Sequence, residues 1–367
     1  MPEVQASRQL QTIQVGRGLA ALAIVFYHTS LLFEQRADLI LFDGAGGYGY
    51  MGVPFFFVLS GFIIGHAHFA DLGRPDRLPP FVRKRFLRVY PVYWVLSALF
   101  VCAAISGMGE PDFSYAPAEF VQAHLLIHVT PNFGPPPLKV AWTLFYEIRF
   151  YLLFALAIAY PRPAMVLACV WGFAIATLSP WNDLSAEWLS YWNLAFPLGL
   201  MACLLFRSGA AGFGSGYVWL GSVAIMAVVC ATPIPAFHGG RSLPMLAMMA
   251  GFAVLILGLA LLERQRAFCL PRGLMFLGDA SYSLYLAHSA AIAVAGSVII
   301  RFDVLDSVSA ELLYLPIVAF AVMGGISAHL VIERPLIAAM NSRRASAPRL
   351  SFSETALEGS NPGSDPR

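Results

Sequence analysis

An arginine and a histidine stand eleven residues apart in the first long apolar stretch of the chain. Arg17 and His28 belong to residues 11–30, QTIQVGRGLAALAIVFYHTS. At about 100° per residue, this separation returns nearly to the same face of a helix, about 16 Å farther along its axis. Ionisable groups are costly in lipid, so they usually face a protein interior or a water-filled cavity and mark a functional site. The pair therefore predicts a functional face of a membrane-spanning helix, with a polar packing pair as the alternative.

Two further arginines, Arg85 and Arg88, lie three residues apart within FVRKRFLRVYP at 81–91. At this spacing they share one face of a helix. Two adjacent guanidinium groups suit a phosphate group, which arginine binds through paired hydrogen bonds. A cationic cluster that touches lipid head groups would have the same composition, so the residues leave both interpretations open.

An acidic side chain, Glu147, lies inside the apolar run WTLFYEIRF at 142–150. A carboxylate in such a segment needs a partner, and the candidates are Arg149, His28 and the neighbouring tyrosines. Glu147 therefore either forms a structural ion pair or orients a catalytic imidazole.

A line of hydroxyl groups that ends in an imidazole follows later in the chain, in GDASYSLYLAH at 278–288. Ser281, Tyr285 and His288 have the spacing of a single helix face, and Tyr282 is adjacent. Such a face could contact a polar substrate within the membrane, or it could form a ladder of hydrogen bonds between helices.

Other motifs favour structural roles. The run 52–62, GVPFFFVLSGF, is typical of close helix packing. The sequence Glu-Arg-Pro at 333–335 indicates an anchor at the membrane interface rather than a site. His124 and His128 have a spacing that a metal could use within a short helix expected near 119–129, but with no third ligand we predict no metal site.

The composition identifies an integral membrane protein. Hydrophobic residues make up 58% of the chain and charged residues 12%, against about 25% charged residues in soluble domains. The first apolar run lacks a signal-peptide cleavage site, so we expect it to be retained as a span. No CxxC pair occurs, and we interpret all five cysteines as small packing residues without a disulfide; they are Cys102, Cys169, Cys203, Cys230 and Cys269.

Ten apolar runs approach the length of about 20 residues that crosses a bilayer. They are 12–33, 48–66, 89–106, 140–159, 164–181, 188–206, 216–234, 243–262, 280–300 and 312–332. With the N-terminus in the cytoplasm, 17 Lys and Arg residues fall inside and 4 outside, which agrees with the positive-inside rule.

The predicted fold is therefore an all-α polytopic bundle of about ten transmembrane helices with both termini in the cytoplasm. Residues 1–10 form a lead, 11–337 the transmembrane domain and 338–367 a disordered cytoplasmic tail. No internal repeat is evident, which weakens a transporter built from inverted halves.

Taken together, the motifs resemble those of the family-3 membrane acyltransferases, bacterial polytopic proteins that acylate sugars. The resemblance covers about residues 11–337 and is greatest to the exopolysaccharide-modifying branch. Thr143 stands where relatives often have serine. The matching motifs are Arg17-x10-His28, GVPFFFVLSGF at 52–62, Arg85-x-x-Arg88-x-x-Pro91, Trp142-x4-Glu147, the Gly278–His288 segment and Glu333-Arg334-Pro335.

The resemblance implies an O-acyltransferase of the bacterial inner membrane with acyl-CoA, usually acetyl-CoA, as the donor. Arg17, Arg85 and Arg88 would hold the donor's phosphates. His28 would act as a general base on a hydroxyl of a glycan or lipid-linked glycan, oriented by Glu147; an acyl-His28 intermediate is the competing chemistry. The residues expected to contact substrate are Trp142, Ser281, Tyr282, Tyr285 and His288.

Two other classes of protein stay open at this stage. A polytopic transporter or flippase would also place Glu147, His28 and His288 within the membrane. A non-enzymatic relative that acts as a sensor or assembly partner would keep the fold. Only the enzyme requires acyl-CoA, and we expect neither nucleic acid nor a metal as a partner.

Overall fold

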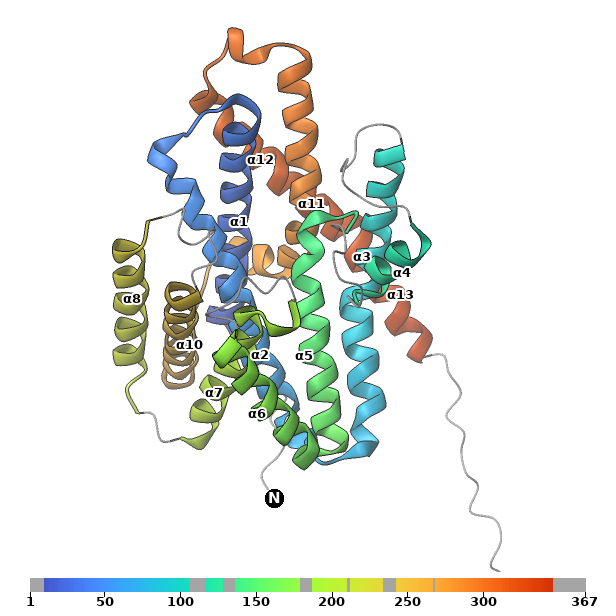
Figure 1. Cartoon of the computed structure of the whole chain (residues 1–367), viewed down its shortest axis with the longest axis vertical. Helices are drawn as coiled ribbons and strands as arrows, with labels where there is room; N and C mark the ends of the chain where they lie inside the picture. Colours follow the sequence, from blue (N-terminus) through green and yellow to red (C-terminus); the bar gives the residue numbers. More distant parts are fainter. Residues whose placement is uncertain are drawn as a thin grey trace, which may run out of the picture.

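The computed structural model describes residues 10–105, 116–127, 136–178, 187–209, 212–233, 242–266 and 268–345, and in these ranges every regular element is helical (Figure 1). Nine helical segments of this part of the chain are long and apolar enough to cross a membrane. The prediction of an all-α polytopic membrane protein is confirmed.

Helix α1 (Gln11–Ala37) packs against α11 (Arg272–Arg301), and α12 (Ala310–Ala328) packs against both. The carboxylate of Glu263 accepts hydrogen bonds from the first two backbone N–H groups of α1, at 2.6 and 2.9 Å. These N–H groups have no partner within the helix, so Glu263 fixes where α1 begins. Gly18 and Gly278 bring the backbones of α1 and α11 into direct contact, because a side chain at either position would overlap the other helix.

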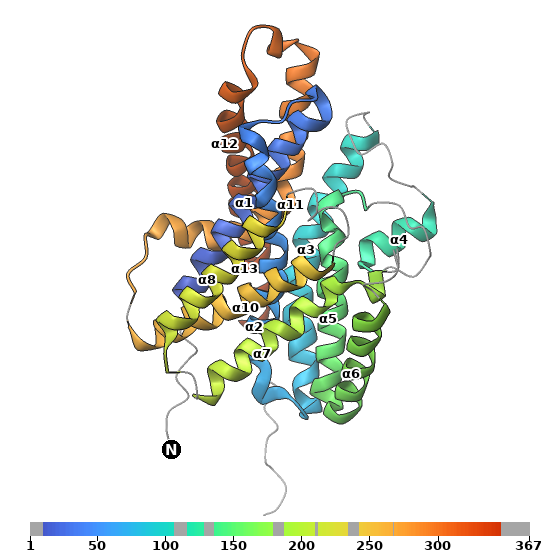
Figure 2. The ribbon, with the colours of Figure 1, turned by 60° about the vertical axis from the view of Figure 1, so that its left-hand side comes forward.

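Helix α2 (Gly52–His68) packs against α7 (Ala195–Ser208) and α10 (Ser242–Gln265), and α8 (Gly214–Ala231) packs on the outer side of α10 (Figure 2). A Cβ atom at Gly61 would overlap the backbone carbonyl of Phe196 in α7. The glycine is therefore what lets these two helices cross closely, as the packing interpretation of residues 52–62 predicts.

Replacing Gly61 with alanine is expected to lower the free energy of unfolding by about 1–3 kcal/mol, because the added methyl group must push α2 away from α7. Gly172→Ala in α6 (Pro161–Leu178) is the matched control, since a Cβ there meets nothing within 4 Å. The thermal unfolding midpoint of each purified variant measures the effect. Equal midpoints for the two variants would contradict the close crossing.

Helices α3 (Leu78–Ile105), α5 (Trp142–Ala159) and α6 (Pro161–Leu178) form the third group, in which α5 packs against the other two. The short helix α4 (Pro117–Leu125) confirms that a helix occurs near the expected range 119–129, but it ends at Leu125. Three side chains of α3 donate hydrogen bonds to successive backbone carbonyls at the C-terminal end of α4. The donors are Tyr93, Trp94 and Tyr90. The last carbonyls of a helix lack partners within it, and although that of Ala123 also accepts from the N–H of Leu126, the three side-chain bonds dock α4 on α3.

Three predicted boundaries differ from the observed ones. Helix α3 begins at Leu78, well before the predicted span at 89–106, and Pro91 lies inside it. The span predicted at 188–206 overlaps the 14-residue helix α7, which begins only at Ala195 and is shorter than the nine segments long enough to cross a membrane. A π-helical turn, His329–Glu333, joins α12 to α13 (Arg334–Ala345), so the predicted domain end at residue 337 falls inside a helix. The predicted tail from residue 346 onward lies outside the described residues.

The interpretation of all five cysteines as packing residues is wrong for four of them. Only Cys203 is buried, whereas the other four are exposed on the outer surface of the bundle, and all five are free. Thiols are compact and weakly polar, so Cys102, Cys169 and Cys230 can lie among the exposed apolar side chains of their helices, while Cys269 lies in the connection before α11.

The turns between helices occupy two opposite ends of the bundle. The α2–α3 and α5–α6 turns share one end, and the α11–α12 turn lies at the other (Figures 1 and 2). The first end holds the cationic residues 74–88 together with Arg162. This grouping is what the positive-inside pattern requires, while the assignment of that end to the cytoplasm stays a prediction.

Candidate functional site

A cavity of about 190 Å³ opens between α1, α2, α3, α5 and α11. Its wall combines mostly apolar side chains of α2 with mostly polar and charged side chains of the other four helices. The polar and charged lining residues are Arg17, Ser60, Arg85, Arg88, Thr143, Glu147, Tyr151, Ser281, Tyr282 and Tyr285. Seven of the ten site residues predicted from the sequence are in this set; His28, His288 and Trp142 are not.

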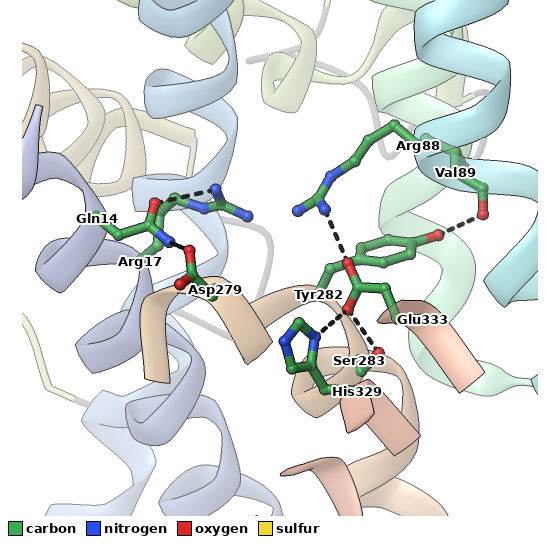
Figure 3. Close-up of polar contacts among 9 residues, drawn as sticks. All are labelled: Gln14, Arg17, Arg88, Val89, Asp279, Tyr282, Ser283, His329 and Glu333. Atoms are coloured by element: carbon green, nitrogen blue, oxygen red, sulfur yellow. Dashed lines mark hydrogen bonds and ion pairs between the residues drawn. The ribbon is translucent and has the colours of Figure 1, made fainter. Parts of the chain in front are cut away.

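Three arginines from two helices meet in this cavity. The guanidinium groups of Arg17 and Arg88 point toward one another, and their charges interact (Figure 3). Arg17 donates a 3.4 Å hydrogen bond to Gln14, whose amide donates to Asp279 of α11. Arg85 and Arg88 share a face of α3, as their spacing predicts. Three positive charges lining one cavity make its wall strongly cationic, and these like charges repel one another.

Arg88 is held by a buried carboxylate from the opposite end of the sequence. Its Nη1 donates a 2.8 Å hydrogen bond to Glu333, whose side chain is 1% exposed. Ser283 and His329 each donate to the other carboxylate oxygen, also at 2.8 Å (Figure 3). The prediction of Glu333-Arg-Pro as an interfacial anchor is therefore wrong for Glu333. The π-helical turn begins at His329 and ends at Glu333, and such turns are frequent at functional sites.

Glu147 lies on α5 with its carboxylate in the cavity wall. Tyr151, one helical turn farther along, donates a short hydrogen bond to it. Of the partners proposed from the sequence, the neighbouring tyrosine is the one that the structure places on Glu147. Arg149 instead points to the aromatic rings of Tyr146 and Trp188, 4.3 and 5.0 Å from their centroids.

The hydroxyl face of α11 borders the cavity. Tyr285 donates a 2.9 Å hydrogen bond to the backbone carbonyl of Val140 and lies 2.9 Å from the hydroxyl of Thr143. Tyr282 donates to the carbonyl of Val89, at 2.7 Å. The buried hydroxyl of Ser281 has no hydrogen-bond partner within the described residues. The interpretation as hydrogen bonds between helices is confirmed for the two tyrosines, whereas contact of this face with a polar substrate stays a prediction.

The two histidines of the predicted site lie together outside the cavity lining. The ring centroids of His28 and His288 are 4.9 Å apart, and the rings are inclined by 52°. Tyr27 approaches the His28 ring edge-on, with centroids also 4.9 Å apart. The structure thus joins His28 to His288 and not to Glu147.

Trp142 lies in an aromatic cluster rather than in the cavity wall. Its ring packs edge-on against those of Trp192, Tyr146 and Phe57, with centroids 5.7, 5.8 and 6.3 Å apart. Phe57 also lines the cavity, so Trp142 supports that wall from behind.

The possible metal spacing at His124 and His128 falls partly outside the described residues, which do not include His128. His124 donates a hydrogen bond to the carbonyl of Phe120 at 2.8 Å and lies 3.2 Å from the hydroxyl of Ser97. Within the described ranges, no group of three or more potential metal ligands occurs.

Comparisons with known proteins identify the family of this chain. A family profile described as an acyltransferase domain matches residues 10–331. The chain is also 31% identical over 315 residues to the exopolysaccharide production protein ExoZ of Rhizobium meliloti, covering 82% of this chain and 93% of ExoZ. The chain belongs to acyltransferase family 3. The resemblance stated from the motifs is confirmed.

Two other relatives of this family-3 acyltransferase are named as an acyltransferase and an O-acetyltransferase. The acyltransferase MdmB of Streptomyces mycarofaciens is 26% identical over 380 residues, covering 90% of this chain and 93% of MdmB. The peptidoglycan O-acetyltransferase OatA of Listeria monocytogenes is 27% identical over 192 residues, covering 47% of this chain and 28% of OatA. The protein is a multi-pass membrane O-acyltransferase. No solved structure matches it significantly.

Proposed function

We propose that this family-3 acyltransferase moves an acetyl group from acetyl-CoA to a hydroxyl of an exported or cell-surface polysaccharide, or of its lipid-linked precursor. The enzyme would lie in the bacterial inner membrane with the arginine end of its cavity toward the cytoplasm. The single observation that supports the proposal most is the convergence of Arg17, Arg85 and Arg88 on one cavity.

The cationic wall suits the phosphates of acyl-CoA. In the described part of the chain, Arg88 has a carboxylate partner, whereas the buried Nε of Arg85 has no hydrogen-bond partner. Arg17 has only a 3.4 Å bond to an amide oxygen. Phosphate oxygens would supply acceptors for these donors and would offset the repulsion between the guanidinium groups.

The position of His28 suits the chemical step. It lies eleven residues beyond Arg17 on α1, about 16 Å along the helix axis. The extended pantetheine arm that joins the phosphates of CoA to its thioester covers a comparable part of the bilayer. His28 would remove the proton of the acceptor hydroxyl, whose oxygen attacks the thioester carbonyl. The thiolate of CoA would then leave and take that proton.

The proposed acceptor is a polysaccharide because of the relatives' names and the chemistry of the site. ExoZ is named for exopolysaccharide production and OatA for the O-acetylation of peptidoglycan. The hydroxyl of Ser281, which has no hydrogen-bond partner among the described residues, and the neighbouring tyrosines would offer hydrogen bonds to a sugar.

Replacing Arg85 with alanine is expected to abolish stabilisation by acetyl-CoA, since it removes a guanidinium whose buried Nε has no hydrogen-bond partner among the described residues. In the wild type, acetyl-CoA at about 100 times its dissociation constant should add roughly 2.7 kcal/mol to the free energy of unfolding. The measurement is the thermal midpoint of the detergent-purified protein with and without acetyl-CoA.

Arg83→Ala is the matched control, because Arg83 lies on the same helix but is exposed and outside the cavity lining. It should keep the full shift. The absence of a shift with any acyl-CoA in folded wild-type protein would contradict the proposed function, and an unchanged shift in Arg85→Ala would contradict the phosphate site.

A further inference from the structure

His288 is a completely buried imidazole with one nitrogen in use. Its Nδ1 lies 3.1 Å from the backbone carbonyl of Leu284, one turn earlier on α11, and its side chain is 0% exposed. A carbonyl oxygen only accepts hydrogen bonds, so Nδ1 carries the proton. In the neutral ring, Nε2 is then an acceptor, and it has no hydrogen-bond partner within the described residues.

The nearest polar ring is that of His28. With centroids 4.9 Å apart and an inclination of 52°, the two imidazoles are close enough for a nitrogen of one to reach a nitrogen of the other after a modest ring rotation. Hydrogen bonds among catalytic groups often tighten only when the substrate is bound. A buried acceptor without a partner is costly, which favours this contact.

We infer that His288 is the positioning residue of His28, accepting a hydrogen bond from one ring N–H of His28 through Nε2. The inference rests on the proposed function and gives His288 the part that the sequence assigned to Glu147. That carboxylate is engaged by Tyr151 and belongs to the cavity wall with the arginines.

The contact determines which nitrogen of His28 acts as the base. With one ring N–H donated to His288, the other nitrogen has its lone pair free for the acceptor hydroxyl. The hydroxyl proton moves to that nitrogen, the oxygen forms a bond to the thioester carbon and the C–S bond breaks. The departing thiolate then takes the proton, so His28 ends neutral and His288 keeps its own proton throughout.

A neutral imidazole suits this depth in the membrane. A buried carboxylate would be costly without several bonding partners, whereas a neutral ring with a backbone partner is not. When His28 becomes charged during transfer, its bond to His288 becomes a charge-assisted one and is strengthened. The pair therefore stabilises the charged state that the reaction passes through.

Two substitutions of His288 separate positioning from packing. In His288→Gln the longer side chain places an amide oxygen near the position of Nε2, where it accepts from His28. In His288→Asn the shorter side chain can bond the carbonyl of Leu284 but does not reach His28. We expect kcat for acetyl transfer from acetyl-CoA to fall about 10- to 100-fold in His288→Asn, and to recover to within a few-fold of wild type in His288→Gln. The KM for acetyl-CoA and the thermal shift it produces should stay unchanged in both.

Each other result has a distinct meaning. Equal losses of kcat in the two variants, or a raised KM with unchanged kcat, would overturn the positioning role, as would wild-type kcat in His288→Asn. Wild-type protein that transfers no acetyl group from acetyl-CoA would instead contradict the proposed function.

Discussion

Replacing His28 with alanine is expected to lower the rate of acyl transfer by about 10²–10⁴-fold, the usual contribution of a general base. The stabilisation by acetyl-CoA should survive, because His28 lies outside the lining of the arginine cavity. The two measurements are acetyl transfer from labelled acetyl-CoA to the glycan and the thermal midpoint with and without acetyl-CoA.

His66→Ala is the control for this substitution, since His66 also lies within a span but stacks on Phe62, away from the site. Near-normal transfer by well-folded His28→Ala protein would exclude His28 from the chemistry. Mass analysis of the wild type mixed with acetyl-CoA alone separates direct transfer from an acyl-His28 intermediate, because only the latter leaves an acetyl group on the protein.

Replacing Glu333 with glutamine is expected to lower the free energy of unfolding by about 2–3 kcal/mol and to raise the KM for acetyl-CoA. The buried carboxylate accepts hydrogen bonds from Arg88, Ser283 and His329. The neutral amide removes the charge opposite Arg88 and places an NH₂ group where only acceptors are needed. Arg88 is 31% exposed, so water limits the loss, and freed Arg88 no longer holds its place in the cavity wall.

Glu263→Gln provides the comparison that separates stability from donor binding. Glu263 also joins two helices, through Gln11 and Thr12, but it does not line the cavity. It should lower the thermal midpoint without changing the KM. If both variants changed only the midpoint, the carboxylate of Glu333 would have no part in positioning Arg88.

Most of the helices could be predicted because a bilayer requires long apolar runs, but two of their boundaries could not. The start of α3 is missed because the RKR cluster at 83–85 has the charge of a connecting segment, although it lies in the first turns of the helix. Residues 188–194 are apolar and are therefore included in the span predicted at 188–206, but they lie in 3-10 turns. Helix α7 begins only just before Pro197, a residue that suits the first turn because it has no N–H to leave unbonded.

The parts of the site that lie on one helix followed from helical spacing. Arg85 with Arg88, and Ser281 with Tyr285, share faces for that reason. Contacts between helices distant in sequence did not follow. Arg88 and Glu333 are 245 residues apart, and nothing in the sequence of either indicates the other. The spacing of His329 and Glu333, four residues apart in an apolar run, was the one local signal of the missed network.

The direct backbone contact between Gly18 and Gly278 holds α1 and α11 rigidly together, so the distances between residues on these two helices are fixed. Arg17 and His28 lie on one of these helices, and Ser281 and His288 on the other. Under the proposed function, this helix pair sets the distance between the phosphate site at Arg17 and the base His28. The arm of CoA between phosphate and thioester is the same in every acyl-CoA. The fixed distance therefore selects for CoA and does not distinguish one acyl group from another. Choice among acyl groups must then depend on the side chains around His28, where the ring of Tyr27 packs against His28 and the ring of Tyr50 packs against Tyr27.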